Sequence, residues 1–323
     1  MNAVLEKLEK IGIVPVIKID DAEKAVPLAK ALAAGGIPCA EVTFRTAQGA
    51  EAIRRIAKEA PEVLVGAGTV LTPAQVDQAI DAGARFIVSP GLNPKTVAYC
   101  REKGIPVTPG CATPSEIEWA LELGLEAVKF FPAEQAGGLE YIKAVCGPYP
   151  GIKFMPTGGV GPGNIAKYIA FDRILACGGS WMATADMISA GDFEKITALS
   201  KEAVLAMLGF AVAHVGVGAK DAEEAAKAAG FFGAMFGFPV KDGGSSVFAG
   251  EGVEVLKPGA VALGERGHIA IGTNSVPRAV AYLERAGVAF DPATAKKDAK
   301  GNVFAIYLKD QVLGFGVHLL QRK

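Results

Sequence analysis

Short apolar segments alternate with amphipathic segments from residue 13 to residue 180 of this chain. Each apolar run has the length of a buried strand, and each following segment repeats its apolar residues with the period of a helix. The runs end roughly every 20 to 27 residues, the length of one strand, one helix and two loops. They lie at residues 13–18, 38–44, 63–68, 85–89, 106–110, 126–131, 152–157 and 173–179. These repeated units predict an α/β fold, a (β/α)8 TIM barrel, rather than an open doubly wound sheet.

Three of the expected helix starts carry residues that cap helices. Threonine or asparagine precedes proline at Thr72-Pro73, Asn93-Pro94 and Thr113-Pro114, and proline favours the first helical position. Glutamine or glutamate follows each threonine three residues later, which predicts a capping box at both. Glycine favours the position just after a helix. The three helices should therefore end at Gly83, Gly104 and Gly124.

Strand alternation decides which side chains face the barrel interior. In the predicted second strand, Val42 and Phe44 suit the helix-covered face, so the residues beside them face inward. The same argument turns Val128 and Phe130 outward in the sixth strand and Phe154 outward in the seventh. The predicted inward side chains are Glu41, Thr43, Arg45, Lys129, Phe131, Met155 and Thr157.

A lysine and a carboxylate inside a barrel need an explanation, because each buried charge costs several kcal/mol unless it is paired. One explanation is a structural ion-pair cluster that fills the barrel. The other is covalent catalysis, in which an amine desolvated beside Phe130 and Phe131 attacks a carbonyl carbon and forms an imine. A protonated imine stabilises a carbanion without a metal. The sequence favours Lys129 as the nucleophile and Glu41 as the general acid/base.

Glycine pairs follow the last two predicted strands of the barrel. The segments Pro156-Thr157-Gly158-Gly159 and Cys177-Gly178-Gly179-Ser180 expose backbone N–H groups, and Ser180 adds a hydroxyl. Barrel enzymes often bind phosphate at the loops after strands 7 and 8. Tight turns also require glycine, so each pair alone is a weak signal. Together, on these two loops, the pairs predict a phosphate site.

A duplication follows residue 209, where the barrel pattern stops. The segment His214-Val-Gly-Val-Gly218 recurs as His268-Ile-Ala-Ile-Gly272, and residues 250–256 recur as residues 314–320. Each histidine segment precedes a helix-like segment, at residues 220–236 and 275–286, and a polar insertion lengthens the second half near residues 291–302.

The chain is therefore expected to form two domains. A barrel covers residues 1–208, and a smaller α+β domain of paired βαβββ modules covers residues 211–323.

Composition narrows the partners and the compartment. The chain has 33 Lys and Arg residues against 34 Asp and Glu residues, which gives no electrostatic footprint for nucleic acid or a membrane surface. Its five cysteines form no C-x-x-C pair, as expected for reduced thiols of a cytoplasmic protein. The N-terminal residues lack the apolar core of a signal peptide, and no segment approaches the ~20 apolar residues of a membrane span.

The barrel motifs resemble those of the 2-keto-3-deoxy-6-phosphogluconate (KDPG) and 4-hydroxy-2-oxoglutarate (KHG) aldolases. The resemblance runs from about residue 5 to residue 207 through six motifs in order: Glu41-Val-Thr-Phe-Arg45-Thr, Val65-Gly-Ala-Gly-Thr69-Val, Ser89-Pro90-Gly, Val128-Lys129-Phe-Phe131-Pro-Ala, Pro156-Thr-Gly-Gly159 and Gly178-Gly-Ser180-Trp. One segment departs from the family: Pro109-Gly110-Cys111-Ala112-Thr113 stands where a bulkier run is expected, which affects the aldehyde pocket.

The resemblance implies a class I aldolase that needs no cofactor and acts on small 2-keto acids. Lys129 would form the imine with pyruvate and Glu41 would be the acid/base. Arg45 and Thr69 would hold the pyruvate carboxylate. The family's phosphate site and pocket walls would fall on Gly158, Gly159, Gly179 and Ser180, and on Pro90, Phe131 and Thr157. A homo-oligomer, a trimer, is also implied.

The duplicated region, about residues 211–320, resembles the glyoxalase or vicinal-oxygen-chelate fold more loosely. In that fold each module supplies two metal ligands, from its first and last strands. The matching positions here are His214, Glu254, His268 and His318, a set that suits divalent Zn, Ni, Co, Fe or Mn. Hydrogen-bonded strand residues in a packing or assembly domain are the alternative.

Two other functions are compatible with parts of this pattern. A barrel isomerase or epimerase with a phosphate grip would use paired acid/base residues or a metal, but it would not need Lys129 beside Phe131. The C-terminal domain could also serve as a sensor or assembly module of a regulated enzyme.

Overall fold

The computed structural model describes residues 2–259 and 264–322 of the 323-residue chain. Backbone contacts divide it into two compact units, Met1–Met207 and Leu208–Lys323. Each unit is described by itself.

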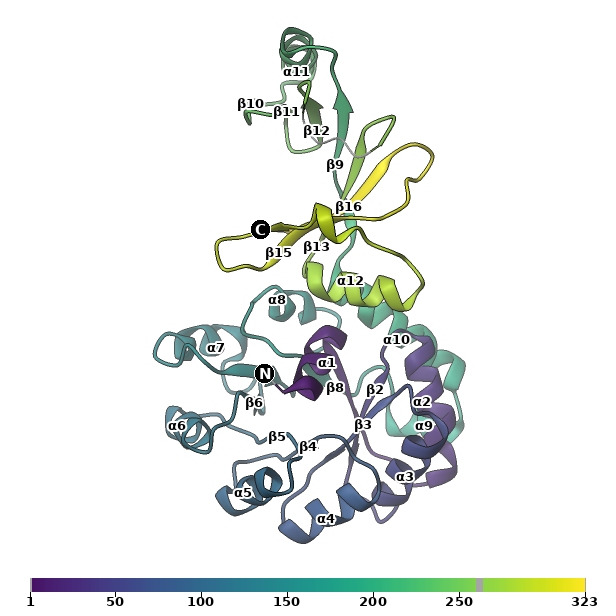
Figure 1. The fold of residues 1–323 in the computed structure, drawn as a ribbon. Helices are drawn as coiled ribbons and strands as arrows, with labels where there is room; N and C mark the ends of the chain where they lie inside the picture. Colours follow the sequence, from purple (N-terminus) through teal and green to yellow (C-terminus); the bar gives the residue numbers. More distant parts are fainter. Residues whose placement is uncertain (1, 260–263, 323) are drawn as a thin grey trace. The chain divides into compact units, whose positions relative to one another are not determined.

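The first unit repeats strand and helix in regular order (Figure 1). Its strands are β1 (Ile13–Ile17), β2 (Cys39–Thr43), β3 (Leu64–Gly68), β4 (Ile87–Val88), β5 (Val107–Thr108), β6 (Ala127–Phe130), β7 (Lys153–Pro156) and β8 (Cys177–Gly179). Its helices are α1 (Ala3–Ile11), α2 (Ala25–Ala34), α3 (Gly49–Glu59), α4 (Pro73–Asp81), α5 (Pro94–Glu102), α6 (Pro114–Glu122), α7 (Gly138–Cys146), α8 (Ile165–Ile169), α9 (Ala185–Ala190) and α10 (Phe193–Leu208), with a 3-10 turn at Ala22–Lys24.

The strands of the first unit form a parallel, TIM-barrel-like ring. Six of them pair in the order β5-β4-β3-β2-β1-β8, and β6 pairs with β7. Backbone hydrogen bonds join the two groups. The Lys129 amide donates to the Pro109 carbonyl at 2.9 Å on one side, and the Leu175 amide donates to the Phe154 carbonyl at 2.8 Å on the other. The expected barrel architecture of this unit is therefore confirmed.

Strands β4 and β5 are shorter than the sequence pattern predicts. Residues 85–89 and 106–110 were expected to be strands, but only Ile87–Val88 and Val107–Thr108 pair as such. Pro106 and Pro109 flank β5, and proline has no N–H to donate to a neighbouring strand. The apolar pattern thus marks the buried segment correctly and overestimates its hydrogen-bonded part.

The predicted helix starts are present, with one difference. Thr72, Asn93 and Thr113 each cap a helix whose first turn contains proline, and Thr113 forms a complete capping box with Glu116. The box expected at Thr72 is incomplete, because the Gln75 side chain accepts from the Leu71 amide instead. Gly83, Gly104 and Gly124 follow these helices with positive φ, as expected for residues that end a helix.

The second unit contains the same order of elements twice. The first half is β9 (Ala211–Gly218), α11 (Ala222–Phe236), β10 (Val240–Asp242), β11 (Ser246–Ala249) and β12 (Val253–Leu256). The second half is β13 (His268–Thr273), α12 (Val276–Arg285), a 3-10 turn at Pro292–Thr294, β14 (Lys296–Lys297), β15 (Val303–Tyr307) and β16 (Gly316–Gln321). The polar segment near residues 291–302, expected to be an insertion, contains the 3-10 turn and β14.

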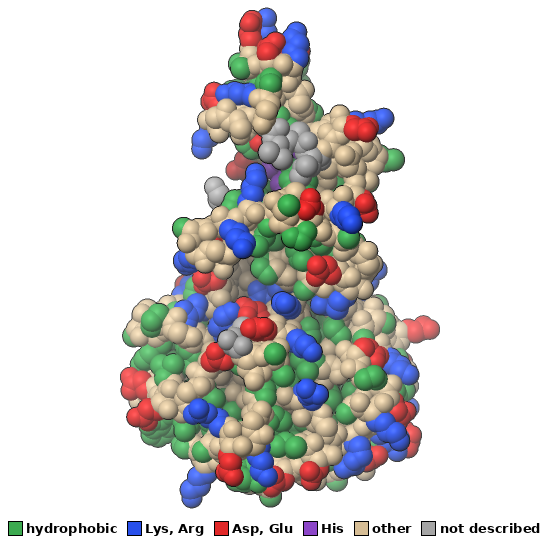
Figure 2. Space-filling view, viewed as in Figure 1, with side chains coloured by type: hydrophobic (Ala, Val, Ile, Leu, Met, Phe, Trp, Pro, Cys, Tyr) green, Lys and Arg blue, Asp and Glu red, His purple; other side chains and the backbone are tan. Residues whose placement is uncertain are grey.

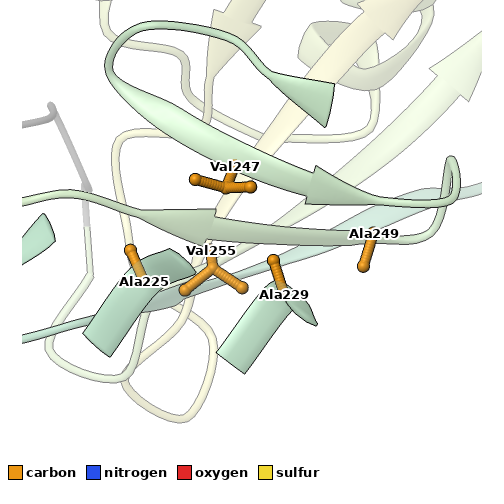
Figure 3. Packing of buried hydrophobic residues seen from close by; sticks show 5 residues of the cluster. All are labelled: Ala225, Ala229, Val247, Ala249 and Val255. Carbon is orange, nitrogen blue, oxygen red and sulfur yellow. The ribbon is translucent and has the colours of Figure 1, made fainter. Parts of the chain in front are cut away.

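One mixed sheet joins these two halves. Its order is β10-β11-β12-β9-β13-β16-β15-β14, and β9 and β13 meet antiparallel at its centre. In the first half, α11 packs against β11 and β12 through small side chains (Figure 3), a buried cluster of Ala225, Ala229, Val247, Ala249 and Val255.

The surface carries charges of both signs. On the face shown in Figure 2, Lys and Arg side chains are interspersed with Asp and Glu, in keeping with the formal net charge of −1. Among residues 2–259 and 264–322, no helix is both long enough and apolar enough to cross a bilayer.

Candidate active site and candidate metal centre

Lys129 and Glu41 meet inside the first unit. Strand β6 carries Lys129 and β2 carries Glu41, and the alternation of each strand turns both side chains inward, as predicted. The Lys129 ammonium nitrogen lies 3.6 Å from Glu41 Oε1, and their side chains are 8% and 1% exposed. Lys129 Nζ also lies 5.3 Å from the centroid of the Phe131 ring. The amine and the carboxyl are thus almost fully shielded from solvent and lie next to an aromatic ring.

Burial dominates the electrostatics of Glu41. Desolvation raises the pKa of its carboxyl, and the nearby Lys129 and Arg45 cations oppose that rise. Its second oxygen, Oε2, is buried and has no hydrogen-bond partner among the described residues. An unpartnered carboxyl oxygen of this kind is able to take up or release a proton.

Arg45 and Thr69 follow the adjacent strands β2 and β3. Arg45 is exposed, and its Nε donates to Thr43 Oγ1 at 3.1 Å. Thr69 adopts a left-handed conformation with φ of 58°, which costs a β-branched residue roughly 1–3 kcal/mol. Hydrogen bonds from Phe44 to Gly68 and from Val70 to Val88 fix the backbone on either side of Thr69. Such enforced strain is typical of functional positions.

Pro90 and Phe131 are exposed beyond β4 and β6, and Phe131 is 39% exposed. The Pro90 carbonyl packs so closely on Gly110 that a Cβ there would lie 2.0 Å from its oxygen. Cys111, at the departure from the family pattern, is buried and directs its sulfur at the carbonyls of Pro109 and Glu116. The Cys111 thiol thus donates to backbone carbonyl oxygens.

The two glycine turns expected to bind phosphate lie side by side. Thr157 and Gly178 are paired across the ends of β7 and β8, and a Cβ on Gly178 would lie 2.2 Å from Thr157 Oγ1. Gly158 and Gly159 have φ of 100° and 80°. Beyond β8, the ring of Trp181 covers Gly179, where a Cβ would lie 1.9 Å from it. The hydroxyl of Ser180 is exposed.

The second unit brings its four expected ligands together. His214 and His268 lie on the central strands, with their Nε2 atoms 3.1 Å apart. Oε2 of Glu254 lies 3.2 Å from His214 Nε2 and 3.1 Å from His268 Nε2. A ring nitrogen of His318 completes a set of three histidine ligand atoms within 4.8 Å of one another.

The protonation states of His318 and Glu254 suit ligation. Burial lowers the pKa of His318 to about 4, so its imidazole is neutral at pH 7. Burial also opposes ionisation of Glu254, but hydrogen bonds from His214, His268 and Ser246 prevail and hold the pKa of its carboxyl well below the usual range. Neutral imidazoles and an ionised carboxylate are the forms that bind a metal ion.

Three further residues, which the sequence patterns did not single out, shape this cluster. Ser246 donates to Glu254 Oε1 at 2.6 Å. The Tyr307 ring stacks on His318 with centroids 4.5 Å apart. Gly216 leaves room for His268, because a Cβ at Gly216 would lie 2.2 Å from that imidazole. The glycine in the His-x-Gly segment was a visible signal for the last of these.

Comparison with known proteins identifies the first unit. The family "Aldolase: KDPG and KHG aldolase" matches residues 4–199. The 2-dehydro-3-deoxy-phosphogluconate aldolase of Treponema pallidum is 53% identical over 202 residues, which cover 62% of this chain and 96% of the relative. The KHG/KDPG aldolase of Escherichia coli K12 is 48% identical over 192 residues, 59% of this chain and 90% of the relative.

Solved structures agree with these relatives. KDPG aldolase of Legionella pneumophila, with pyruvate captured at low pH as a covalent carbinolamine intermediate, is 38% identical with a TM-score of 0.60, over 62% of this chain and 97% of that one. The Zymomonas mobilis enzyme with 3-phosphoglycerate is 42% identical with a TM-score of 0.58, over 62% of this chain and 94% of that one. Motifs, barrel, buried lysine–carboxyl pair and relatives agree, and this chain belongs to the KDPG and KHG aldolase family of lyases.

Proposed function

We propose that the first unit is a class I aldolase that cleaves 2-keto-3-deoxy-6-phosphogluconate to pyruvate and glyceraldehyde 3-phosphate, 4-hydroxy-2-oxoglutarate to pyruvate and glyoxylate, or both. The observation that carries the proposal is the buried Lys129 amine 3.6 Å from the Glu41 carboxyl. A structural ion pair and a metal-dependent isomerase both leave the aldolase motifs around this pair unexplained.

The reaction follows from these two groups. The Lys129 amine attacks the C2 carbonyl of the 2-keto acid, and loss of water from the carbinolamine gives a protonated imine. A base takes the proton of the C4 hydroxyl, the C3–C4 bond breaks, and its electrons move into the imine as an aldehyde leaves. The enamine then takes a proton at C3, and water releases pyruvate and the amine. Glu41, whose pKa is raised by burial, is positioned to carry these protons.

Substrate binding is assigned to the groups around the pair. Arg45 and Thr69 would hold the keto-acid carboxylate, and Pro90, Phe131 and Thr157 would line the pocket. The turns with Gly158, Gly159, Gly179 and Ser180 would bind the phosphate of the phosphorylated substrate through N–H groups and a hydroxyl.

Trapping tests the covalent step. Pyruvate with borohydride should add to the peptide that contains Lys129 without any added metal. Lys129→Met should abolish the adduct, and Lys143→Met, which removes an exposed lysine paired with Glu140, should not. Adducts on another lysine in the parent protein would refute the assignment.

We also propose that the second unit is a glyoxalase-like domain with one divalent metal ion held by His214, Glu254, His268 and His318. The spacing supports this. Metal–ligand bonds of about 2.0–2.1 Å imply neighbouring ligand atoms about 2.8–3.0 Å apart in an octahedron and about 3.3–3.4 Å apart in a tetrahedron. The distances among His214, His268 and Glu254 lie between 3.1 and 3.2 Å. When bound, such an ion would act as a Lewis acid toward an oxygen ligand.

Elemental analysis of protein purified without a His-tag tests this site. The parent should retain about one divalent ion per chain after soaking in zinc, nickel or manganese and desalting, and His268→Ala should not. Equal, sub-stoichiometric metal in both proteins would leave hydrogen-bonded strand histidines as the explanation.

A further inference from the structure

We infer that the cavity beside the histidine cluster binds a carboxylate with an aromatic or apolar body, and that Lys296 pairs with its negative charge. This inference rests on the proposed metal centre and adds a ligand class and a specificity residue to it.

The cavity has the size of a small-molecule site. Its volume is about 440 Å³, within the range of roughly 300 to 1,000 Å³ of ligand pockets. Three of the four proposed metal ligands are buried histidines at its wall. The remaining lining is mostly apolar and includes Phe248, Leu256, Phe304, Ala305, Tyr307 and Leu320.

Strand register places Lys296 on the same face as the cluster. Lys296 lies opposite Ala305, and Ala305 lies opposite Leu320. Directly opposed residues share one face of a sheet. Two residues along the same strands, and on the same face, Tyr307 lies opposite His318. This pair is roughly 7 Å from the row formed by Lys296, Ala305 and Leu320. A lysine side chain spans that distance, and Lys296 lines the same cavity as His318.

The charges of the lining favour an anion. Glu254 and Lys296 are its ionic side chains apart from the histidines. A divalent ion and the Glu254 carboxylate leave one positive charge, and Lys296 adds another. The Lys296 ammonium has no acidic partner among the described residues. By contrast, Lys257, the residue that follows β12, is paired with Asp242.

The aromatic wall defines the rest of the ligand. Phe248 meets the His214 ring edge-on at 5.7 Å, and Tyr307 stacks on His318 at 4.5 Å. A ring or short apolar chain packed here would bring an attached carboxylate between the ion and the Lys296 ammonium. A charge-assisted bond to that ammonium adds affinity that a neutral analogue cannot gain.

Mandelate, an aromatic 2-hydroxy carboxylate, is a suitable probe for the cobalt-loaded full chain. Its binding should change the visible absorption of Co(II), and its Kd should rise about tenfold in Lys296→Met, the worth of one charge-assisted contact. Lys296→Arg should restore most of the affinity. Lys297→Met is the matched control, since Lys297 is equally charged and exposed but lies opposite Val303, one step farther from His318.

The outcomes separate this inference from the metal proposal. Neutral mandelamide should bind the parent and Lys296→Met with the same Kd. Equal mandelate affinity in Lys296→Met and Lys297→Met, or no spectral change with mandelate in cobalt-loaded protein, would overturn the carboxylate site and leave the metal site standing. A protein that takes up no cobalt would overturn the metal centre itself, and with it this inference.

Discussion

Replacing Gly68 with alanine should displace the Glu41 carboxyl without altering any group that touches substrate. Gly68 ends β3 beside the Glu41–Lys129 pair. A Cβ at Gly68 would lie 2.2 Å from Oε1 of Glu41 and 2.7 Å from its Cγ. Oε1 is the oxygen that faces the Lys129 amine. Ordinary van der Waals contact begins at 3.4 Å. Because Glu41 is 1% exposed, its carboxyl cannot swing into solvent.

The carboxyl therefore has to shift by about 1 Å within the barrel, a misplacement that costs roughly a hundredfold in rate. We expect kcat for cleavage of 2-keto-3-deoxy-6-phosphogluconate, measured by coupling pyruvate to a dehydrogenase, to fall by about that factor. Long incubation with pyruvate and borohydride should still label Lys129, because the nucleophile is unchanged. Overpacking should also lower the free energy of unfolding by about 1–3 kcal/mol, which denaturant titration measures.

Gly151→Ala is the matched control, since a Cβ at this exposed glycine meets nothing within 4 Å. A kcat for Gly68→Ala indistinguishable from that of Gly151→Ala, in a protein that remains folded, would refute the role given to the position of Glu41.

Four further outcomes are expected. Glu41→Gln should lower kcat by ~10²–10⁴-fold in a folded protein, and near-normal turnover would mean that another group carries the protons. Ser180→Ala should lower kcat/KM for the phosphorylated substrate, with a loss of transition-state stabilisation of roughly 1.5–3 kcal/mol, and barely affect kcat/KM for 4-hydroxy-2-oxoglutarate. Equal losses on both substrates would show that the loop only shapes the pocket. Chelators should leave aldol cleavage intact, and their inhibition of it would contradict imine chemistry. Gly216→Ala should abolish metal retention by pushing aside His268, whereas Gly218→Ala, with nothing within 4 Å of its Cβ, should retain the ion; identical retention would count against the proposed centre.

Periodicity predicted most of the barrel, and the reason is visible in particular residues. Val42, Phe130 and Phe154 are at most 1% exposed, as expected for apolar residues on the covered outer face of a barrel strand. Fixing those residues outward also turns Glu41 and Lys129 inward, since successive side chains alternate. Their approach to 3.6 Å could not be predicted, because it depends on the curvature that brings β2 and β6 across the ring.

The second site shows the same limit more clearly. The repeat marked the three histidines and Glu254, and the sheet brings them together. Tyr307 and Ser246 reach the cluster through the register of β15 with β16 and of β11 with β12. Register depends on pairing between strands and not on the pattern within one strand. The left-handed backbone of Thr69 was equally invisible, since threonine normally avoids it.

The junction between β5 and β6 makes the catalytic lysine part of the barrel's closure. Lys129 donates its own amide to the Pro109 carbonyl and accepts from the Cys111 amide, so the residue proposed to attack substrate is also a backbone link between the two groups of strands. Glu41 stands on β2, far away in sequence, and contacts between distant segments form slowly during folding. In a refolding experiment, recovery of pyruvate trapping should therefore follow ring closure and lag behind recovery of the helical circular dichroism signal. The covalent reaction of Lys129 would then report when the barrel has finished folding.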